Sequence, residues 1–253
     1  MRHTMPCVGL VVLAGCLTFV VAPDEELGLD RKLAKALPPS LPTVVVDPGH
    51  GGKDDGATAL GMVEKDITLD VSFRVEKLLQ SFGFPTVLTR RDNRFISLEE
   101  RANIANRIEP SIFVSIHFDK SHHAPANGVA TFYGKSKVAP ERSWTWIGFF
   151  NSTPEPEADH GEELAGYVQA ALLARTGSNN RGIHGRDLYV LRHVRGPAVL
   201  VEGGFLSNAF DARLLTTNEY RDRVAAAVVE GIITFQSKQP HRQEPAQLAA
   251  AAR

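Results

Sequence analysis

The chain has little cysteine, and both of its cysteines lie at one end. Cys7 and Cys16 fall within the first 16 of 253 residues. If that segment is removed, the remaining body cannot form a disulfide, so cysteine content does not indicate a redox compartment.

The chain also lacks an excess of charge of either sign and lacks internal repeats. Its 28 Lys and Arg residues nearly balance its 29 Asp and Glu residues, which gives a formal net charge of −1. This balance gives no reason to propose nucleic acid as a partner, and we expect none. The hydrophobic share of 43% and the charged share of 23% are ordinary for a globular protein.

Long hydrophobic runs are missing except near the N-terminus. The apolar run Pro6–Ala22 follows Arg2 and is shorter than the ~20 residues that usually span a membrane. We therefore interpret residues 1–22 as an export signal, which predicts a location in the periplasm or cell envelope. Leu13-Ala14-Gly15-Cys16 resembles a bacterial lipobox, so lipidated Cys16 is a candidate membrane anchor; an ordinary cleaved signal is the alternative.

The remaining chain divides by composition into a spacer, a body and a tail. Residues 23–42 are charged and then proline-rich, as expected of a linker. Residues 237–253 are polar and alanine-rich, which predicts a disordered tail. The body, 43–236, has the size of one domain, and we expect it to act as a monomer.

Segments of strand and helix character alternate along the body. This alternation predicts a single α/β domain with a twisted, mostly parallel sheet of about six strands and helices on both faces. The expected strands are 43–47, 85–89, 111–116, 128–133, 187–192 and 197–201, and the expected helices are 65–82, 97–108, 162–175 and 218–235.

Three of the apolar strands run into residues that can bind a metal or move protons. VVVDPGHGG leads to His50, SIFVSIHFD to His117, and AVLVEGGF to Glu202, while Glu64 lies where the first helix begins. In a parallel sheet these strand ends meet at one edge. Taken singly, each has an ordinary structural explanation, such as a hydrogen-bonded histidine or a favourable helix-dipole position worth about 0.3–1 kcal/mol.

Four such residues at one edge favour a functional site. Two imidazoles and one carboxylate form a common catalytic zinc set that leaves a position for water. A further carboxylate can then serve as general base. The short helical HExxH motif is absent, so any such site must be assembled from segments far apart in the sequence.

Several motifs along the body resemble one enzyme family. DPGHGGKDDGA, VEKDITLDV, VLTRRD with SLEERANIAN, FVSIHFD and PAVLVEGGFLSN occur in that order. They resemble the zinc-dependent N-acetylmuramoyl-L-alanine amidases of the cell-separation type (Amidase_3 family). The resemblance implies that His50, Glu64 and His117 bind one Zn²⁺ and that Glu202 is the catalytic glutamate. It also implies a peptidoglycan substrate, cleaved between the lactyl group of N-acetylmuramic acid and L-alanine of the stem peptide.

The chain departs from the family pattern in two places. Phe118-Asp119 stands where the family usually has Ala-Asn, and Asp119 is a candidate hydrogen-bond acceptor for a ligating imidazole. Segment 134–160 is long for a connection and carries Trp144, Trp146 and two phenylalanines. Some relatives have a regulatory helix there that an activator protein displaces. We favour a surface loop that borders the cleft, and a requirement for an activator stays open.

Other polar residues are weaker candidates for the site. Arg90 and Arg101 could bind a substrate carboxylate, but we favour surface or helix-end ion pairs that order the loop. His184 is a candidate substrate contact. The other histidines of the body are expected to be polar loop residues: His122, His123, His160 and His193.

Two other functions compete with the amidase. One is another zinc-dependent hydrolase of the cell wall, such as a peptidase or a deacetylase. The other is a catalytically dead wall-binding scaffold, which should have lost Glu202 or a zinc ligand. All four residues are present, which favours the enzyme.

Overall fold

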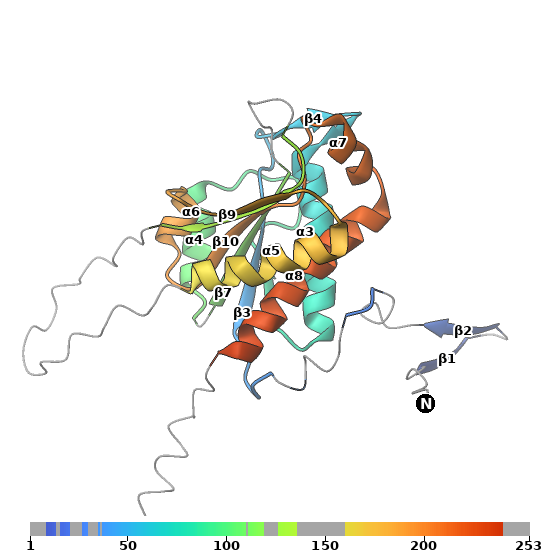
Figure 1. Cartoon of the computed structure of the whole chain (residues 1–253). Coiled ribbons are helices and arrows are strands. Elements are labelled where there is room, and N and C mark those ends of the chain that lie inside the picture. Colours follow the sequence, from blue (N-terminus) through green and yellow to red (C-terminus); the bar gives the residue numbers. More distant parts are fainter. Residues whose placement is uncertain are drawn as a thin grey trace, which may run out of the picture.

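A six-stranded sheet forms the centre of the folded domain (Figure 1). The computed structural model describes residues 9–13, 16–20, 27–29, 35, 37–109, 111–118, 126–135 and 160–239. Across the sheet the strands are β6 (Thr86–Leu88), β3 (Thr43–Pro48), β7 (Ser111–His117), β10 (Ala198–Glu202), β8 (Val129–Gly134) and β9 (Asn180–Arg186).

Four neighbouring strands, β6, β3, β7 and β10, are mutually parallel. β8 is antiparallel to β10, and β9 runs parallel to β8. The central strands are buried on both faces, which is why they read as continuous apolar runs such as Val44–Val46. The prediction of a mostly parallel sheet of six strands is confirmed.

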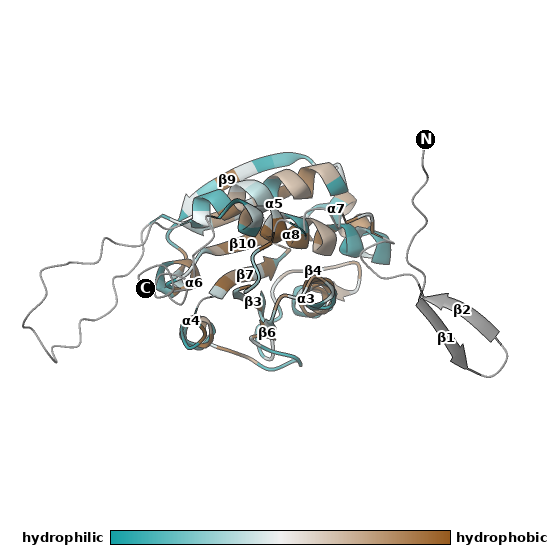
Figure 2. Ribbon diagram, turned by 90° about the horizontal axis from the view of Figure 1, so that it is seen from below, coloured by the Kyte–Doolittle hydropathy of each residue, from teal (hydrophilic) through white to brown (hydrophobic). Residues whose placement is uncertain are grey.

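Helices cover both faces of the sheet, as predicted. One face packs against α3 (Glu64–Ser81), α5 (Gly161–Thr176) and α8 (Asn218–Lys238), and the other against α4 (Leu98–Asn106) and α6 (Tyr189–His193). Seen along the sheet in Figure 2, α4 and α6 lie on one side of the strands and α3 and α8 on the other. The alternation of side chains along a strand decides which core each joins: Val44 and Val46 face α3, whereas Val45 faces α4.

Helix α4 begins where the sequence predicts a cap. The Ser97 side chain accepts a hydrogen bond from the backbone N–H of Glu100 at 3.2 Å, which satisfies one of the free donors of the first turn. The Glu100 carboxylate instead pairs with Arg107 at the other end of the helix. The serine half of the expected capping box is therefore present.

One predicted strand is wrong. Residues 187–192 were expected to be extended, but Tyr189–His193 form the short helix α6, and the strand lies before them as β9. Val190 and Leu191 are buried against the α4 face of the sheet, which a helical turn achieves. β9 gave no apolar signal because it is a polar edge strand, coloured largely hydrophilic in Figure 2.

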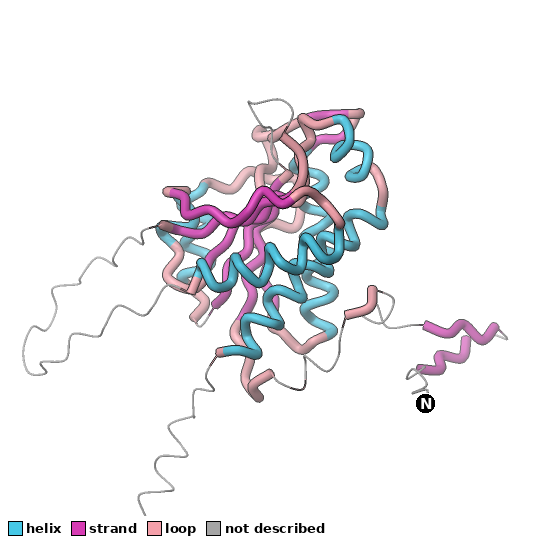
Figure 3. The backbone as a smooth tube through the Cα atoms, viewed as in Figure 1, coloured by secondary structure: helices cyan, strands magenta, loops and turns pink. Residues whose placement is uncertain are grey.

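Several elements were not predicted. They are the hairpin of β4 (Thr58–Ala59) and β5 (Met62–Val63), the helix α7 (Ala209–Leu215), and an N-terminal hairpin of β1 (Gly9–Leu13) and β2 (Cys16–Val20). In Figure 3 the strands of the main sheet lie side by side, with helices outside them. None of the helices in the described ranges is long and apolar enough for a membrane span.

The boundaries of the body differ slightly from the prediction. Helix α8 continues to Lys238, two residues beyond the expected end of the body. Part of the expected linker packs on the domain: Leu29 is buried, and the Arg175 side chain donates to the carbonyls of Leu27 and Gly28. The rest of the expected tail, from residue 240, lies outside the described residues.

Helices α5 and α8 pack so closely that the contact requires a glycine. A Cβ atom on Gly231 of α8 would lie 2.6 Å from Cα of Val168 in α5. Alanine normally favours a helix over glycine by about 1 kcal/mol. Here we expect Gly231→Ala to lower the free energy of unfolding by about 1–3 kcal/mol, because the helices must move apart. Urea unfolding measures this change.

Gly166 in α5 provides a matched control. A Cβ at Gly166 would meet no atom within 4 Å. Gly166→Ala should therefore raise stability by about 0.5–1 kcal/mol. Equal effects of the two substitutions would show that helix packing does not restrict Gly231.

Candidate metal centre and catalytic site

Two histidines and a glutamate meet at the carboxyl edge of the sheet. His50 follows β3, His117 ends β7 and Glu64 begins α3. Their candidate ligand atoms all lie within 4.8 Å of one another. Glu64 Oε1 lies 3.1 Å from His50 Nε2 and 3.4 Å from His117 Nδ1, and the two imidazole centroids are 4.9 Å apart. The predicted convergence of these three residues is thus present in the structure.

Backbone N–H groups fix the Glu64 carboxylate. Oε2 accepts from Ala57 N at 2.8 Å and Oε1 accepts from Phe118 N at 2.9 Å. Glu64 is 2% exposed, so these bonds replace the water that a buried carboxylate loses. Because Phe118 follows His117 directly, the second bond also ties the carboxylate to the end of β7.

Two glycines allow the three residues to approach one another. A Cβ on Gly49 would lie 2.4 Å from Nε2 of the His117 ring, and a Cβ on Gly56 would lie 2.6 Å from Glu64 Oε2. Gly56 also has φ +67°, a left-handed conformation that glycine adopts without strain. The glycines of DPGHGGKDDGA therefore provide space for the site as well as turns.

His50 itself has an unusual backbone conformation. Its φ of 59° lies in the left-handed region, which is uncommon for a residue with a side chain. Such conformations persist when the surroundings over-determine them, and they cluster at functional sites. Here the surroundings are two arginines, which bind the loop that carries His50.

Arg90 and Arg101 are buried and bind backbone carbonyls of this loop. Arg90 donates to the carbonyls of Pro48 at 3.1 Å and Gly49 at 2.7 Å, and Arg101 donates to those of Pro48 at 2.7 Å and His50 at 2.6 Å. Arg90 is 0% exposed and Arg101 is 3% exposed, so neither lies on the surface. The expected ion pair near a helix end is present for Arg101, which lies near the start of α4 and pairs with Asp47. Both arginines order the loop, through its backbone and from inside the protein.

Asp47 compensates the charge of Arg101. Its carboxylate accepts from Arg101 Nη1 and Thr89 Oγ1, each at 2.6 Å, and from Ser115 Oγ at 2.8 Å. Asp47 is 1% exposed, so this network satisfies a carboxylate that has no contact with bulk water. The acidic residue in TVVVDPGH thus anchors the cation that positions the loop carrying His50.

Glu202 ends β10, beside the strand that carries His117. The parallel register of β10 and β7 pairs Glu202 with His117, and the antiparallel register with β8 pairs it with Ala130. Paired residues on neighbouring strands point to the same face of a sheet, and their backbones are roughly 5 Å apart. Glu202 is 6% exposed. A buried carboxylate therefore lies one strand away from the group of three.

The residues around Glu202 fit together closely. A Cβ on Gly203 would lie 2.7 Å from the Phe118 ring, so the bulky residue after His117 requires a glycine after Glu202. The Tyr220 hydroxyl from α8 donates to the Gly203 carbonyl at 3.0 Å. Phe118, which departs from the family pattern, is 0% exposed and belongs to the core on the α3, α5 and α8 side of the sheet.

The electrostatics of the site lower the pKa of Glu64 and raise the pKa of His50. Burial is the largest influence on Glu64 and would raise its pKa, but hydrogen bonds with His117 and His50 outweigh it, so the pKa lies below its usual range. Burial would lower the pKa of His50, whereas Glu64 and Asp54 raise it, and the net pKa lies above its ordinary 6.5. Asp54 Oδ2 lies 3.0 Å from His50 Nδ1, on the far side of the ring from Glu64.

The donor set matches that of a catalytic zinc ion. Two imidazole nitrogens and one carboxylate oxygen face one another. The other nitrogen of the His50 ring lies 3.0 Å from an Asp54 carboxylate oxygen, the kind of group that commonly orients a ligating histidine. Within the described ranges, no other cluster of histidine, cysteine and acidic side chains has this geometry.

The other histidines that the structure describes lie outside this group. His184 bonds to the Arg181 carbonyl and stacks near Phe132, and His193 stacks on Tyr189. His160 pairs with Glu163. Several predictions fall outside the described residues and are untested: Asp119, His122, His123 and residues 136–159 of the loop.

Sequence reasoning missed Asp54 and Asp47 as supporting residues. Asp54 lies four residues after His50 in a glycine-rich loop, and Asp47 interrupts an apolar strand. A charged residue inside an otherwise buried strand is a usable signal, because burial requires that it be paired. Thr89 and Ser115 carry no such signal, since their role depends on a contact with Asp47 far away in the sequence.

Comparison with known proteins places this geometry in a family. Residues 44–234 match the N-acetylmuramoyl-L-alanine amidase family, Amidase_3. The chain is 33% identical over 193 residues to the amidase LytC of Bacillus subtilis, a match that covers 76% of this chain but 35% of LytC. The chain therefore spans about a third of that relative.

Solved structures agree with this match over nearly their whole length. AmiC2 of Nostoc punctiforme, an N-acetylmuramoyl-L-alanine amidase, has a TM-score of 0.66 and 34% identity, covering 78% of this chain and 97% of AmiC2. The CwlD amidase of Clostridioides difficile, solved in complex with the GerS lipoprotein, has a TM-score of 0.67 and 29% identity, covering 79% and 100%. The fold and site define an α/β amidase domain. The chain belongs to the N-acetylmuramoyl-L-alanine amidase family, Amidase_3.

The buried ion pair of Arg101 and Asp47 should contribute strongly to stability. Arg101→Leu should lower the free energy of unfolding by about 3–5 kcal/mol, because it leaves a buried carboxylate without its charged partner. Arg107→Leu is a control on the same helical segment, since its pair with Glu100 is exposed and worth less than about 1 kcal/mol. Urea unfolding of both variants checks the difference, and similar small losses would contradict the assigned role.

The second prediction concerns pH. Because the folded-state pKa of His50 is raised, its contribution to stability without metal is fully present below about pH 6.5 and is lost as the pH rises through the folded-state value. Metal binding needs the neutral imidazole, so zinc affinity should fall as the pH falls through the same range.

Calorimetric titration with zinc between about pH 6 and 8 tests this expectation. The number of protons released per ion should increase at the lower pH. His193→Gln, outside the site, should leave the profile unchanged. An affinity independent of pH would show that His50 does not exchange a proton for the metal.

Proposed function

We propose that this chain is a zinc-dependent N-acetylmuramoyl-L-alanine amidase acting on peptidoglycan. It would hydrolyse the amide between the lactyl group of N-acetylmuramic acid and L-alanine of the stem peptide. The observation that carries this proposal is the convergence of His50, Glu64 and His117, with Glu202 paired to His117 across the sheet. Membership of the amidase family supports the choice of substrate.

In this proposal His50, Glu64 and His117 hold one zinc ion. A bound zinc ion supplies a Lewis acid that polarises a carbonyl oxygen and makes water more acidic. Glu202 accepts the proton of the attacking water and delivers it to the leaving nitrogen of L-alanine. The loop from Pro48 to His50 keeps its geometry during this transfer, because Arg90 and Arg101 bind its carbonyls.

The proposal includes a place of action in the cell envelope. The N-terminal apolar run supports export, and the lipobox-like sequence ending at Cys16 supports lipid attachment. LytC is named as an N-acetylmuramoyl-L-alanine amidase, and CwlD was solved with a lipoprotein partner. A protein activator for this chain is consistent with that complex. Membrane fractionation of the wild type and of Cys16→Ser tests the anchor; equal membrane retention would exclude it.

Product analysis distinguishes the amidase from other cell-wall hydrolases. Purified protein should release intact stem peptides with a free L-alanine amino group from labelled muropeptides. A peptidase would cut within the stem, and a deacetylase would release acetate. A chelator should abolish release and zinc should restore it, whereas a binding scaffold would release nothing under either condition.

The sharpest test of the catalytic residue is Glu202→Gln. This change keeps the size of the side chain but removes its ability to carry a proton. We expect turnover to fall by about 10²–10⁴-fold. Zinc binding, measured by calorimetry, should stay close to that of the wild type, because Glu202 is not among the three candidate ligands.

Glu230→Gln is a matched control for this variant. Glu230 lies on α8 and pairs with Arg175, away from the metal-binding residues. Its replacement should leave turnover unchanged. A Glu202→Gln variant with near wild-type turnover would remove Glu202 from the mechanism.

A further inference from the structure

The pairing of β8 with β9 contains a bulge. These two strands lie on the side of Glu202 that is away from His117. Ala130 of β8 pairs with Glu202 on one side. On its other side the register with β9 shifts, so that Arg181 and Gly182 both lie opposite Ala130. Bulges are rare in parallel pairs and are over-represented next to active sites, where they re-aim a side chain.

Side-chain hydrogen bonds from Asn180, which is exposed, and from the buried Gln169 hold this bulge in place. The Asn180 side-chain oxygen accepts from Gly182 N at 2.8 Å and from Gln169 Nε2 at 2.9 Å. Gln169, from α5, is 5% exposed and also donates to the Val129 carbonyl. Gly182 has φ +86°, which glycine supplies without strain. The backbone around Arg181 is therefore tied, through Asn180, to the buried Gln169 of α5.

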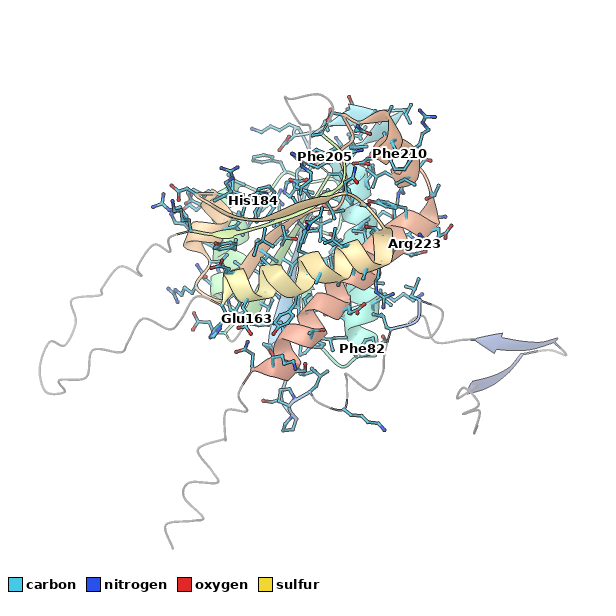
Figure 4. The ribbon with its side chains drawn as sticks, viewed as in Figure 1. Phe82, Glu163, His184, Phe205, Phe210 and Arg223 are labelled. Atoms are coloured by element: carbon cyan, nitrogen blue, oxygen red, sulfur yellow. The ribbon has the colours of Figure 1, made fainter. Side chains whose placement is uncertain are left out.

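The Arg181 guanidinium rests on the ring of Phe205. Its Cζ lies 4.9 Å from the ring centroid, and Phe205 follows Glu202 by three residues. Figure 4 shows Phe205 at the end of the body where Figure 1 places β4 and α7, whereas His184 lies farther along β9. The aromatic contact thus fixes the cation close to the strand end that carries Glu202.

This guanidinium keeps its hydrogen-bond donors available. Arg181 is exposed and, within the described part of the chain, its side chain forms no hydrogen bond or ion pair. The nearby Asp211 carboxylate instead accepts from the backbone N–H groups of Gly128 and Phe205. A guanidinium presents five N–H donors in a planar fork that matches a carboxylate. Arg90 and Arg101, by contrast, use their donors within the protein.

We propose that Arg181 binds a carboxylate of the stem peptide, on the leaving side of the scissile amide. The inference rests on the proposed function, because Glu202 delivers its proton to the leaving nitrogen and so faces the peptide portion of the substrate. The backbone at Arg181 lies two strand spacings, roughly 10 Å, beyond that of Glu202. An extended peptide covers this distance in about three residues. Arg181 therefore selects a carboxylate near the amino end of the stem.

Two soluble substrates test this selection. One is N-acetylmuramoyl-L-alanyl-D-glutamate, and the other is the same compound with both glutamate carboxyls converted to carboxamides. The wild type should have the lower KM for the acid. Arg181→Gln should raise that KM by about 10- to 100-fold with little change in kcat, because a charge-assisted bond is lost. The KM for the carboxamide should stay the same.

Arg186→Gln is a control from the other end of the same strand. Arg186 is also exposed and, among the described residues, forms no ion pair. Its replacement should preserve the preference for the acid. Arg181→Lys keeps the charge but loses the planar fork, so it should retain part of the preference.

Three results would overturn the inference. A wild type without a preference for the acid shows that no carboxylate is selected. An Arg181→Gln variant that slows both substrates equally shows that the residue only supports the loop after Glu202. A wild type that cleaves neither these compounds nor polymeric peptidoglycan refutes the proposed function and this inference together.

Discussion

The loop that carries His50 is held by two buried cations, and the rest of the site depends on them. Beyond the end of a strand, a carbonyl no longer has a regular ladder partner, yet a buried one must still be satisfied. Arg90 and Arg101 satisfy the carbonyls of Pro48, Gly49 and His50. They make a left-handed His50 tolerable, and this conformation places its imidazole against Glu64.

The buried charges of the site have partners that offset the free-energy cost of removing them from water. Asp47 pairs with Arg101, and its carboxylate oxygens also accept hydrogen bonds from the hydroxyl groups of Thr89 and Ser115. Glu64 follows the same rule, since backbone N–H groups and two imidazoles surround its carboxylate. A site built in this way is rigid before any ligand arrives, which is the condition for electrostatic preorganisation.

The order of the strands places different chemical groups on the two sides of Glu202. The parallel strands bring His50 and His117 to one side of Glu202, and the reversed pair of β8 and β9 forms the other side. The candidate metal ligands therefore lie on one flank of the Glu202 carboxylate, and the Arg181 guanidinium lies on the other. This asymmetry is consistent with a substrate whose carbonyl and leaving peptide occupy opposite flanks. The bulky Phe118 fits at this edge because its neighbour Gly203 has no side chain.

Residues with strong local or periodic signals could be predicted from the sequence. Val44–Val46 and the apolar part of β7 and β10 identified the central strands, because a strand buried on both faces must be apolar throughout. Ser97 identified the start of α4 through its cap. The meeting of His50, Glu64 and His117 followed from topology, since parallel strands present their carboxyl ends at one edge.

The burial of the two arginines and the formation of β9 depend on contacts between residues far apart in the sequence, so only the tertiary structure reveals them. Arg90 and Arg101 occur in polar segments that suggest surface positions. Their burial is favourable because carbonyls and a carboxylate 41 to 54 positions away in the sequence accept most of their hydrogen bonds to the loop. β9 has the composition of a loop, and its pairing with β8 makes it a strand. The sequence by itself determined which side chains could do chemistry and at which strand ends they lie. The folded chain decided which charges are buried and which remain available, because the cost of desolvating a charge depends on partners that no local pattern reveals.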